Sequence, residues 1–143
     1  MKSRTRARGT ALQALYEIDL VGHPLGYVLE DRLAEAEYDD RLQTFVRTIV
    51  MGVYPLTAKL DQYIAEHAPE WPLDQVAVVD RNILRIALWE IAVDDQTPVK
   101  VAINEAVELA KIYGSDSAPR FVNGVLGSLA DRRNEIRQAI LNP

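Results

Sequence analysis

Apolar residues recur every three to four positions along nearly the whole chain, which is the spacing of helices that each bury one face. No long stretch alternates apolar and polar residues between hairpin turns, as strands of a sheet would. The pattern therefore predicts an all-α protein, a compact bundle of about seven helices. The predicted helices span residues 4–21, 26–36, 40–53, 56–67, 74–92, 101–113 and 119–140, and a break within the last one stays open.

One segment divides the chain internally, Ala68-Pro69-Glu70-Trp71-Pro72. Its two prolines, three positions apart, cannot both lie inside one helix, because proline lacks the amide hydrogen that the helix needs. We expect helical halves of approximately 1–68 and 73–143 that share an interface, with Trp71 packed. At 143 residues these halves most simply form a single domain.

The stretch 79–91 carries apolar side chains around most of its circumference, as a central helix surrounded by others would. Two carboxylates on it, Asp80 and Glu90, nevertheless project in apolar directions. A buried unpaired charge is strongly destabilising, so each must meet Arg81, Arg85, a helix end or an outside partner. We expect an internal ion pair for Glu90, whereas an interface role stays open for Asp80.

Two further helices carry polar or small residues on one face. In the helix 101–113, Glu105 and Glu108 lie on a polar face that we expect to be solvated, since no Glu-x-x-His motif marks a carboxylate metal site. In the last helix, Gly124 and Gly127 lie opposite the apolar arc. Glycine inside a helix lowers the stability of the helix by about 1 kcal/mol relative to alanine, so two glycines indicate a place where a side chain would not fit. We expect another helix to approach closely there, with a ligand as the alternative.

Composition narrows the classes of function. Hydrophobic residues make up 48% and charged residues 26%, the balance of an ordinary globular protein, and the absence of cysteine excludes disulfides, thiolate metal sites and cysteine nucleophiles. No phosphate-binding loop, dinucleotide fingerprint, zinc-protease motif or nucleophile elbow occurs. We therefore expect no enzyme, no catalytic residue, no metal and no cofactor. With no membrane-length apolar run and no secretory signal, we expect a cytoplasmic protein without membrane contact.

Charge is unevenly placed along the chain. The net charge is −5, yet residues 1–16 hold four cations, Lys2, Arg4, Arg6 and Arg8, and no acid. A short cationic arm on an acidic protein favours a restricted contact with a polyanion, although a merely solvated arm is the alternative. On a helical wheel Arg6 points to solvent, while Arg4 and Arg8 lie at the edge of the apolar arc. For Arg8, structural pairing and RNA contact both stay open.

Four blocks of sequence together resemble one known family. They are Arg6-Ala7-Arg8 with Ala14-Leu15-Tyr16, Val79-Asp80-Arg81 with Ile83-Leu84-Arg85, the run from Val101 to Lys111 that contains Ile103-Asn104-Glu105-Ala106, and Phe121-Val122-Asn123-Gly124-Val125-Leu126. In this combination the chain closely resembles the NusB family of transcription antitermination factors along essentially its whole length.

The resemblance implies an all-helical protein of two subdomains that binds single-stranded boxA RNA of ribosomal RNA leader transcripts. It also implies a partner, the small ribosomal-subunit protein NusE, and action within an RNA polymerase antitermination complex. The RNA-binding positions that it implies are Lys2, Arg4, Arg6, Arg8, Arg120, Phe121 and Asn123, and the partner-binding positions are Tyr16, Asp80 and Arg81. The segment 115–119 departs from the family's loop.

Two other interpretations compete with this one. The chain could be a protein-binding or homodimeric helical adaptor without specific RNA binding, and a homodimer is compatible with either function. A related helical domain also stands at the N-terminus of some ribosomal RNA methyltransferases. We favour a free-standing factor, because the sequence ends at Pro143 without a cofactor-binding domain.

Overall fold

The computed structural model describes residues 1–68 and 75–143, and these residues form helices and no strand. The elements are α1 (Ser3–Val21), α2 (Leu25–Ala36), α3 (Asp40–Val53), the 3₁₀ turn η1 (Tyr54–Leu56), α4 (Thr57–Glu66), α5 (Val78–Trp89), the π-helical turn η3 (Glu90–Asp94), α6 (Val99–Tyr113), α7 (Ala118–Ala130) and α8 (Arg133–Leu141). The all-α prediction is confirmed, and the last predicted helix is broken into α7 and α8.

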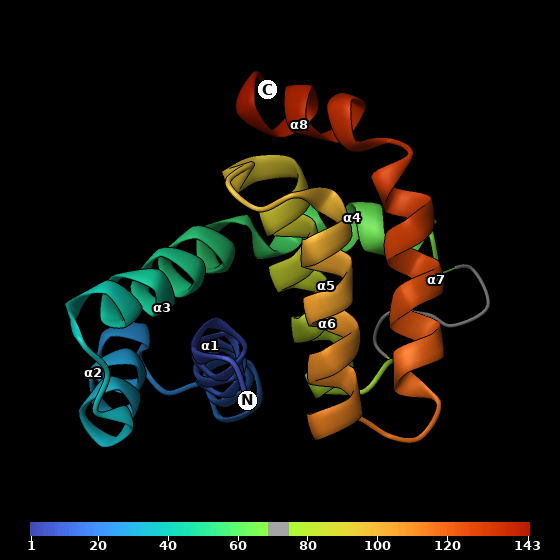
Figure 1. Ribbon diagram of the computed structural model, residues 1–143. Coiled ribbons are helices and arrows are strands. Elements are labelled where there is room, and N and C mark those ends of the chain that lie inside the picture. Colours follow the sequence, from blue (N-terminus) through green and yellow to red (C-terminus); the bar gives the residue numbers. More distant parts are fainter. Residues whose placement is uncertain (69–74) are drawn as a thin grey trace.

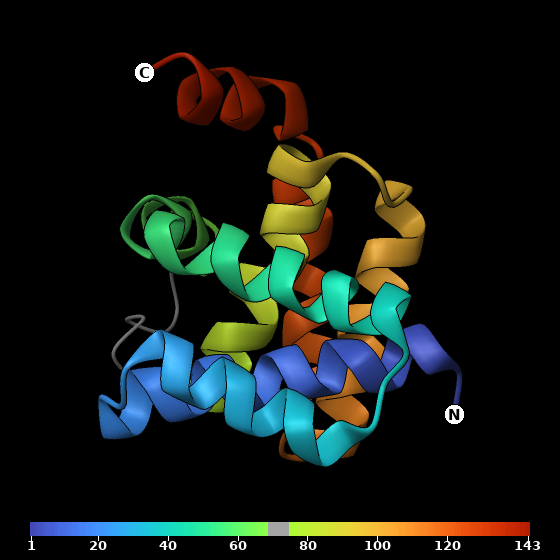
Figure 2. The ribbon, with the colours of Figure 1, turned by 90° about the vertical axis from the view of Figure 1, so that its left-hand side faces the viewer.

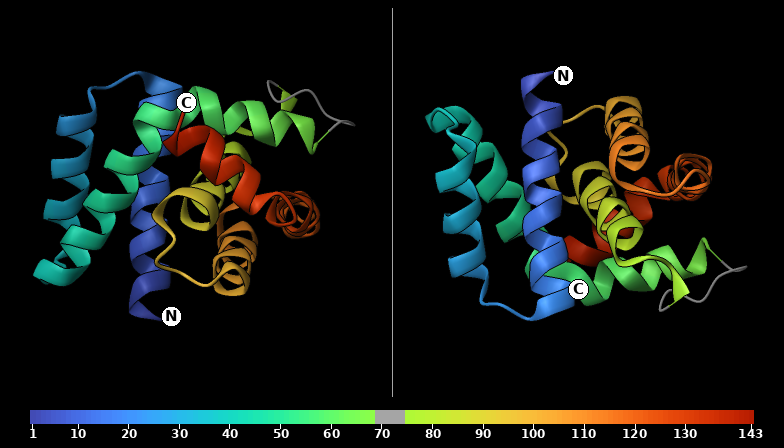
Figure 3. Two further views of the ribbon diagram at one scale, coloured as in Figure 1. Left: turned by 90° about the horizontal axis from the view of Figure 1, so that it is seen from above. Right: turned by 90° about the horizontal axis from the view of Figure 1, so that it is seen from below.

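Helix α1 lies between two groups of helices (Figures 1 and 3). It packs against α2 and α3 on one side and against α5 and α6 on the other. Helix α7 packs along α6, and α8 lies at the opposite end of the molecule from α1, against η3 (Figure 2). Contacts with helices distant in sequence thus hold both α1 and α7 in place.

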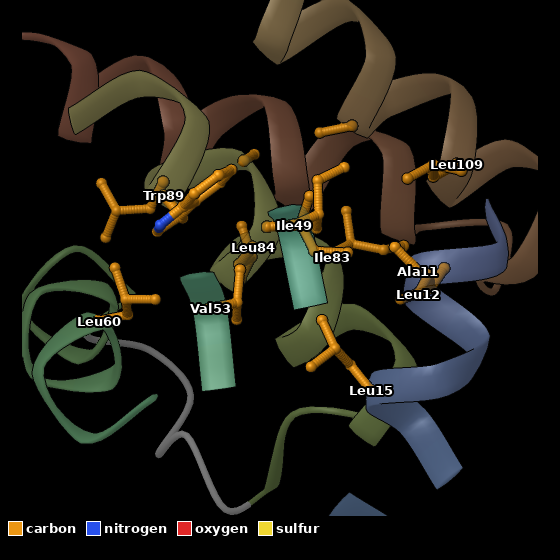
Figure 4. Packing of buried hydrophobic residues seen from close by; sticks show 14 of the residues in the cluster. Ala11, Leu12, Leu15, Ile49, Val53, Leu60, Ile83, Leu84, Trp89 and Leu109 are labelled. Carbon is orange, nitrogen blue, oxygen red and sulfur yellow. The ribbon is translucent and has the colours of Figure 1, made fainter. Parts of the chain in front are cut away.

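The core is centred on α5, as Figure 4 shows. Residues 82–89 of this helix are all buried, which confirms the prediction of a central helix. Ile83 and Leu84 belong to the hydrophobic core. Helices α1, α3, α4 and α6 contribute further buried side chains to it. Those labelled in Figure 4 are Ala11, Leu12, Leu15, Ile49, Val53, Leu60 and Leu109. Each fully buried leucine or isoleucine stabilises the fold by about 1.5–3 kcal/mol.

Helix ends follow the local chemistry of the sequence. Asp39 caps α3, because its side chain accepts a hydrogen bond of 3.0 Å from the amide of Leu42. At the end of α1, Gly22 adopts a left-handed conformation with φ of 81°, which glycine tolerates without strain. Within the described ranges, no helix is both long enough and apolar enough to cross a membrane.

The predicted divide at Pro69, Trp71 and Pro72 lies outside the described residues. The prediction of two halves, approximately 1–68 and 73–143, stays a prediction. Helices from both ranges nevertheless share one core, because α1 packs on α5 and α6.

Candidate nucleic-acid interface

Two arginines at the start of α1 are exposed and held on aromatic rings. The guanidinium carbon of Arg4 lies 4.9 Å from the ring centroid of Phe45, and that of Arg6 lies 4.8 Å from the ring centroid of Tyr38. Arg6 also donates a hydrogen bond of 3.1 Å to the carbonyl of Ala36. An aromatic face fixes the direction of a guanidinium group. The N–H edge of that guanidinium stays open to a ligand. Lys2, just before the helix, is exposed as well.

Arg8, by contrast, lies in the interior. Only 3% of its side chain is exposed, and it forms a bidentate ion pair with Glu90, of which 2% is exposed. Arg8 Nη2 lies 2.8 Å from Glu90 Oε1, and Arg8 Nε lies 3.1 Å from both carboxylate oxygens. Of the two alternatives for Arg8, the structural pair is the one formed, so we remove Arg8 from the residues that could touch RNA. The internal ion pair expected for Glu90 is confirmed.

The surroundings of this pair correct a second expectation. Glu105 is only 17% exposed, and it accepts a hydrogen bond of 2.8 Å from the hydroxyl of Thr5. The expectation of a solvated face is therefore wrong for Glu105, because α1 covers it. Glu108 stays about half exposed, 3.9 Å from Lys111. No cluster of side chains suited to a metal ion occurs in the part of the chain that the structure describes.

Two neighbouring hollows line one side of α1, and a third lies at the start of α7. We call them together the groove. The first is lined by Arg6, Thr10, Gln13, Arg32, Glu35, Ala36 and Tyr113, the second by Leu12, Gln13, Tyr16, Arg32, Val79 and Tyr113, and the third includes Asp80, Ser115, Ser117, Arg120 and Phe121. Their volumes are about 250, 370 and 460 Å³.

The first two hollows join through shared residues. Gln13, Arg32 and Tyr113 line both the first and the second, and Val79 of the second is followed in the chain by Asp80 of the third. Tyr113 can lie across α1 because residue 9 is glycine, since a Cβ there would come within 2.7 Å of the tyrosine hydroxyl. The first two hollows thus form one continuous surface that begins at Arg6, and the third begins one residue further along α5, at Asp80.

The structure brings some predicted site residues together and separates others. Asp80 shares the third hollow with Arg120 and Phe121, whereas Tyr16 lies in the second. Asn123 is exposed on α7 but lines none of the three hollows, and neither does Arg81. Sequence reasoning missed Gln13, Arg32 and Tyr113, because their place in the groove depends on contacts between distant helices.

Asp80 is buried without a charge partner among the described residues. Its side chain is 8% exposed, and its Oδ1 atom has no hydrogen-bond partner. Arg85, a partner considered from the sequence, instead lies 2.7 Å from Asp61 and 2.8 Å from Asp19. Burial raises the pKa of the Asp80 carboxyl, because desolvation disfavours its charged form.

The glycines of α7 do not serve the purpose that we expected. A Cβ at Gly124 or Gly127 would meet no atom within 4 Å. The expectation that another helix packs closely there is therefore wrong for the described residues. The alternative, close approach of a ligand, stays a prediction.

A comparison with known families identifies the chain. The sequence model of the NusB family matches residues 5–131. The chain belongs to the NusB family. It is 48% identical over 134 residues to the transcription antitermination protein NusB of Roseiflexus castenholzii, covering 92% of this chain and 94% of that protein. It is 42% identical over 139 residues to the protein of the same name from Bacillus subtilis, covering 97% and 100%.

Solved structures of family members share the fold. NusB of T. maritima superposes with a TM-score of 0.85 at 31% identity, covering 95% of this chain and 96% of that one. A chain in a crystal structure of antitermination factors NusB and NusE in complex with dsRNA gives a TM-score of 0.83 at 26% identity, covering 92% and 98%. The family and the fold expected from the sequence are thus confirmed.

Proposed function

We propose that this protein is a transcription antitermination factor that binds single-stranded boxA RNA of ribosomal RNA leader transcripts together with NusE. The observation that carries the proposal is its membership of the NusB family over residues 5–131, combined with a groove that starts at exposed arginines. The relatives bear the name of antitermination proteins, and one structural neighbour is complexed with NusE and dsRNA. The role is regulatory rather than catalytic.

In this proposal the RNA strand contacts the two ends of the groove, which are the first and the third hollow. Arg6, which lines the first hollow, and Arg4, exposed two residues earlier on the same arm, meet phosphates at one end, and Arg120 meets them at the other. Single strands are commonly bound by cations along the backbone and by aromatic side chains under the bases, and Phe121 lies where it would serve the second purpose. Among the described residues the three hollows are lined by only three cations, Arg6, Arg32 and Arg120, so affinity for RNA is modest without a basic partner.

NusE would occupy the second hollow in this arrangement. Two exposed aromatic side chains lie there, Tyr16 at 38% and Tyr113 at 37% exposure. Exposed aromatic residues beside an apolar floor are typical of protein interfaces, and Leu12 and Val79 supply that floor. With NusE in place the complex would act on RNA polymerase. A homodimer through the same surface would compete with NusE.

The test is binding of labelled boxA RNA and of a scrambled strand, with and without NusE, over a range of salt concentrations. The Arg4→Ala/Arg6→Ala double variant should bind boxA more weakly, and its slope of log affinity against log salt should be shallower by about 0.7 for each lost phosphate contact. Lys59→Ala is the matched control, because Lys59 is exposed on α4 and lines none of the hollows.

Two results would contradict the proposal. Equal retention of boxA and scrambled RNA, in the presence of NusE, would favour a helical adaptor without specific RNA binding. An unchanged salt slope in the double variant would remove the arginine arm from the interface.

A further inference from the structure

The two exposed arginines at the start of α1, Arg4 and Arg6, each lie over an aromatic ring that comes from another part of the fold. The ring under Arg4 belongs to Phe45 on α3, and the ring under Arg6 belongs to Tyr38, in the connection between α2 and α3. Neither ring is free to move with its arginine, because Tyr38 is 6% exposed and Phe45 packs against the hydrophobic core. The α2–α3 region therefore offers the arginines a fixed surface.

Tyr38 contacts the start of α1 through its hydroxyl as well as its ring. The hydroxyl lies 2.7 Å from the hydroxyl of Thr10, one helical turn after Arg6 on α1. The carbonyl of Ala36, just before this tyrosine, accepts a hydrogen bond of 3.1 Å from Arg6. Arg6 is thus held by a ring and a hydrogen bond, and the helix that carries it is held beside them.

Phe45 connects Arg4 to the interior. The guanidinium carbon of Arg8 lies 5.0 Å from the centroid of the same ring that lies 4.9 Å from Arg4. Arg8 is itself immobilised by its buried ion pair with Glu90. The ring therefore contacts an immobile side chain and the core, and Arg4 takes its direction from both.

An aromatic ring holds a guanidinium group without cancelling its charge. In the part of the chain that the structure describes, neither Arg4 nor Arg6 forms an ion pair. Exposed carboxylates are available in the sequence, since Glu37 and Asp39 flank Tyr38. A carboxylate partner would have to be displaced before a phosphate could bind, whereas a ring occupies only the face of the guanidinium.

An arginine that is fixed before binding increases the affinity for a ligand. A long side chain loses rotamer freedom when it binds, and this loss weakens binding by about two- to tenfold for each side chain. A guanidinium group that already lies over a ring has lost much of this freedom in the free protein. The loss is then part of folding and no longer part of binding.

We propose that Tyr38 and Phe45 are positioning residues of the RNA interface, which hold the guanidinium groups of Arg6 and Arg4 in place for the RNA phosphates. The inference rests on the proposed function and deepens it, because it assigns a role in RNA binding to two aromatic side chains that carry no charge. The α2–α3 region then contributes to the interface without supplying either of these cations.

The test is a double-mutant cycle on the affinity for boxA RNA in the presence of NusE, over a range of salt concentrations. Phe45→Leu should weaken binding about two- to tenfold. The slope of log affinity against log salt should stay that of the wild type, because no cation is removed. In the Arg4→Ala background the same substitution should have no effect, whereas a purely structural role would weaken binding equally in both backgrounds.

Conservative variants separate the ring from general packing. Phe45→Tyr and Tyr38→Phe keep a ring under each arginine and should bind boxA nearly as the wild type does, although the second loses the hydrogen bond to Thr10. Tyr38→Leu removes the ring and should weaken binding as Phe45→Leu does. Leu42→Ala is the matched control for lost packing, because Leu42 is a partly buried core residue of α3 without a ring, and it should bind like the wild type.

The side-chain Nε–H signals of the free protein measure the positioning without RNA. Arg4 should become mobile in Phe45→Leu, and Arg6 in Tyr38→Leu, each without a change at the other arginine. Equal weakening by Phe45→Leu in the two backgrounds, or an equally ordered Arg4 in that variant, would overturn the inference and leave RNA binding intact. If the wild type fails to bind boxA in the presence of NusE, the proposed function itself is wrong, even where the rings order the arginines.

Discussion

The two ends of α5 each bury a carboxylate, and they treat it in opposite ways. At the C-terminal end, Glu90 accepts three hydrogen bonds from Arg8 and lies within 3.4 Å of the Thr97 hydroxyl. At the N-terminal end, Asp80 is nearly as buried but leaves an oxygen without a partner. A paired buried charge holds elements together, whereas an unpaired one lowers the stability of the fold. Four substitutions test this comparison.

Arg8→Met should have the largest effect. It leaves Glu90 buried without its cation, and breaking a buried pair in this way costs about 3–5 kcal/mol of unfolding free energy. Urea unfolding measures the loss. The double variant Arg8→Met/Glu90→Leu should be more stable than Arg8→Met alone, because it removes both charges. A loss below about 1 kcal/mol in the single variant would show that the pair does not hold α1 to η3.

Arg85→Met should have an intermediate effect. Arg85 is 6% exposed, but its partners Asp61 and Asp19 are 24% and 30% exposed, so water can solvate the carboxylates that it leaves behind. We expect a loss of about 1.5–3 kcal/mol, the range for hydrogen bonds to charged groups, again from urea unfolding. A loss larger than that of Arg8→Met would contradict the argument that burial of the abandoned partner decides the cost.

Asp80→Asn should change stability in the opposite direction. The variant should be more stable at neutral pH by an amount on the order of 1 kcal/mol, because an unpaired buried charge is replaced by a neutral amide. Burial raises the folded-state pKa of Asp80 above its ordinary value of 3.8, so the wild type gains protons more readily when folded. The free energy of unfolding of the wild type should therefore fall further below that of Asp80→Asn as pH rises from about 3.8 through the folded-state pKa. Thermal melts over this pH range measure it, and a variant less stable than wild type at neutral pH would assign Asp80 a structural role.

Glu108→Gln should have the smallest effect. Glu108 and Lys111 are 52% and 61% exposed and lie 3.9 Å apart, and such pairs three residues apart on a helix contribute about 0.2–0.5 kcal/mol. The same unfolding assay at low and high salt should show a small loss that salt removes. A loss above about 1 kcal/mol would mean that solvated and buried charges on this fold do not differ as we describe.

Hydrophobic periodicity predicted the helices well because it records which face of each helix is buried, as in the central stretch that became α5. It also placed Arg4 and Arg8 at the edge of the apolar arc, where both lie about 5 Å from the ring centroid of Phe45. It could not choose between the alternatives for Arg8, since its partner Glu90 is 82 positions away. Glu105 was misread for the same reason, because Thr5 reaches it from another helix.

The candidate site could be predicted only in part. Motifs pointed to Arg6, Tyr16, Asp80 and Phe121 one by one, but nothing local indicates that Asp80 shares a pocket with Phe121 rather than with Tyr16. That arrangement follows from how the α6–α7 loop packs on the first turn of α5. Tyr113 was missed because an aromatic residue at a helix end is equally compatible with the core.

The most direct test of the account is to map boxA RNA onto the protein by the amide signals of the full-length chain in the presence of NusE. The account predicts changes along the groove, at Arg6, Gln13, Ser117 and Phe121, and none around the Arg85 ion pairs or on α8. Signals that change at Arg85 and along α8 while those of the groove stay still would contradict it.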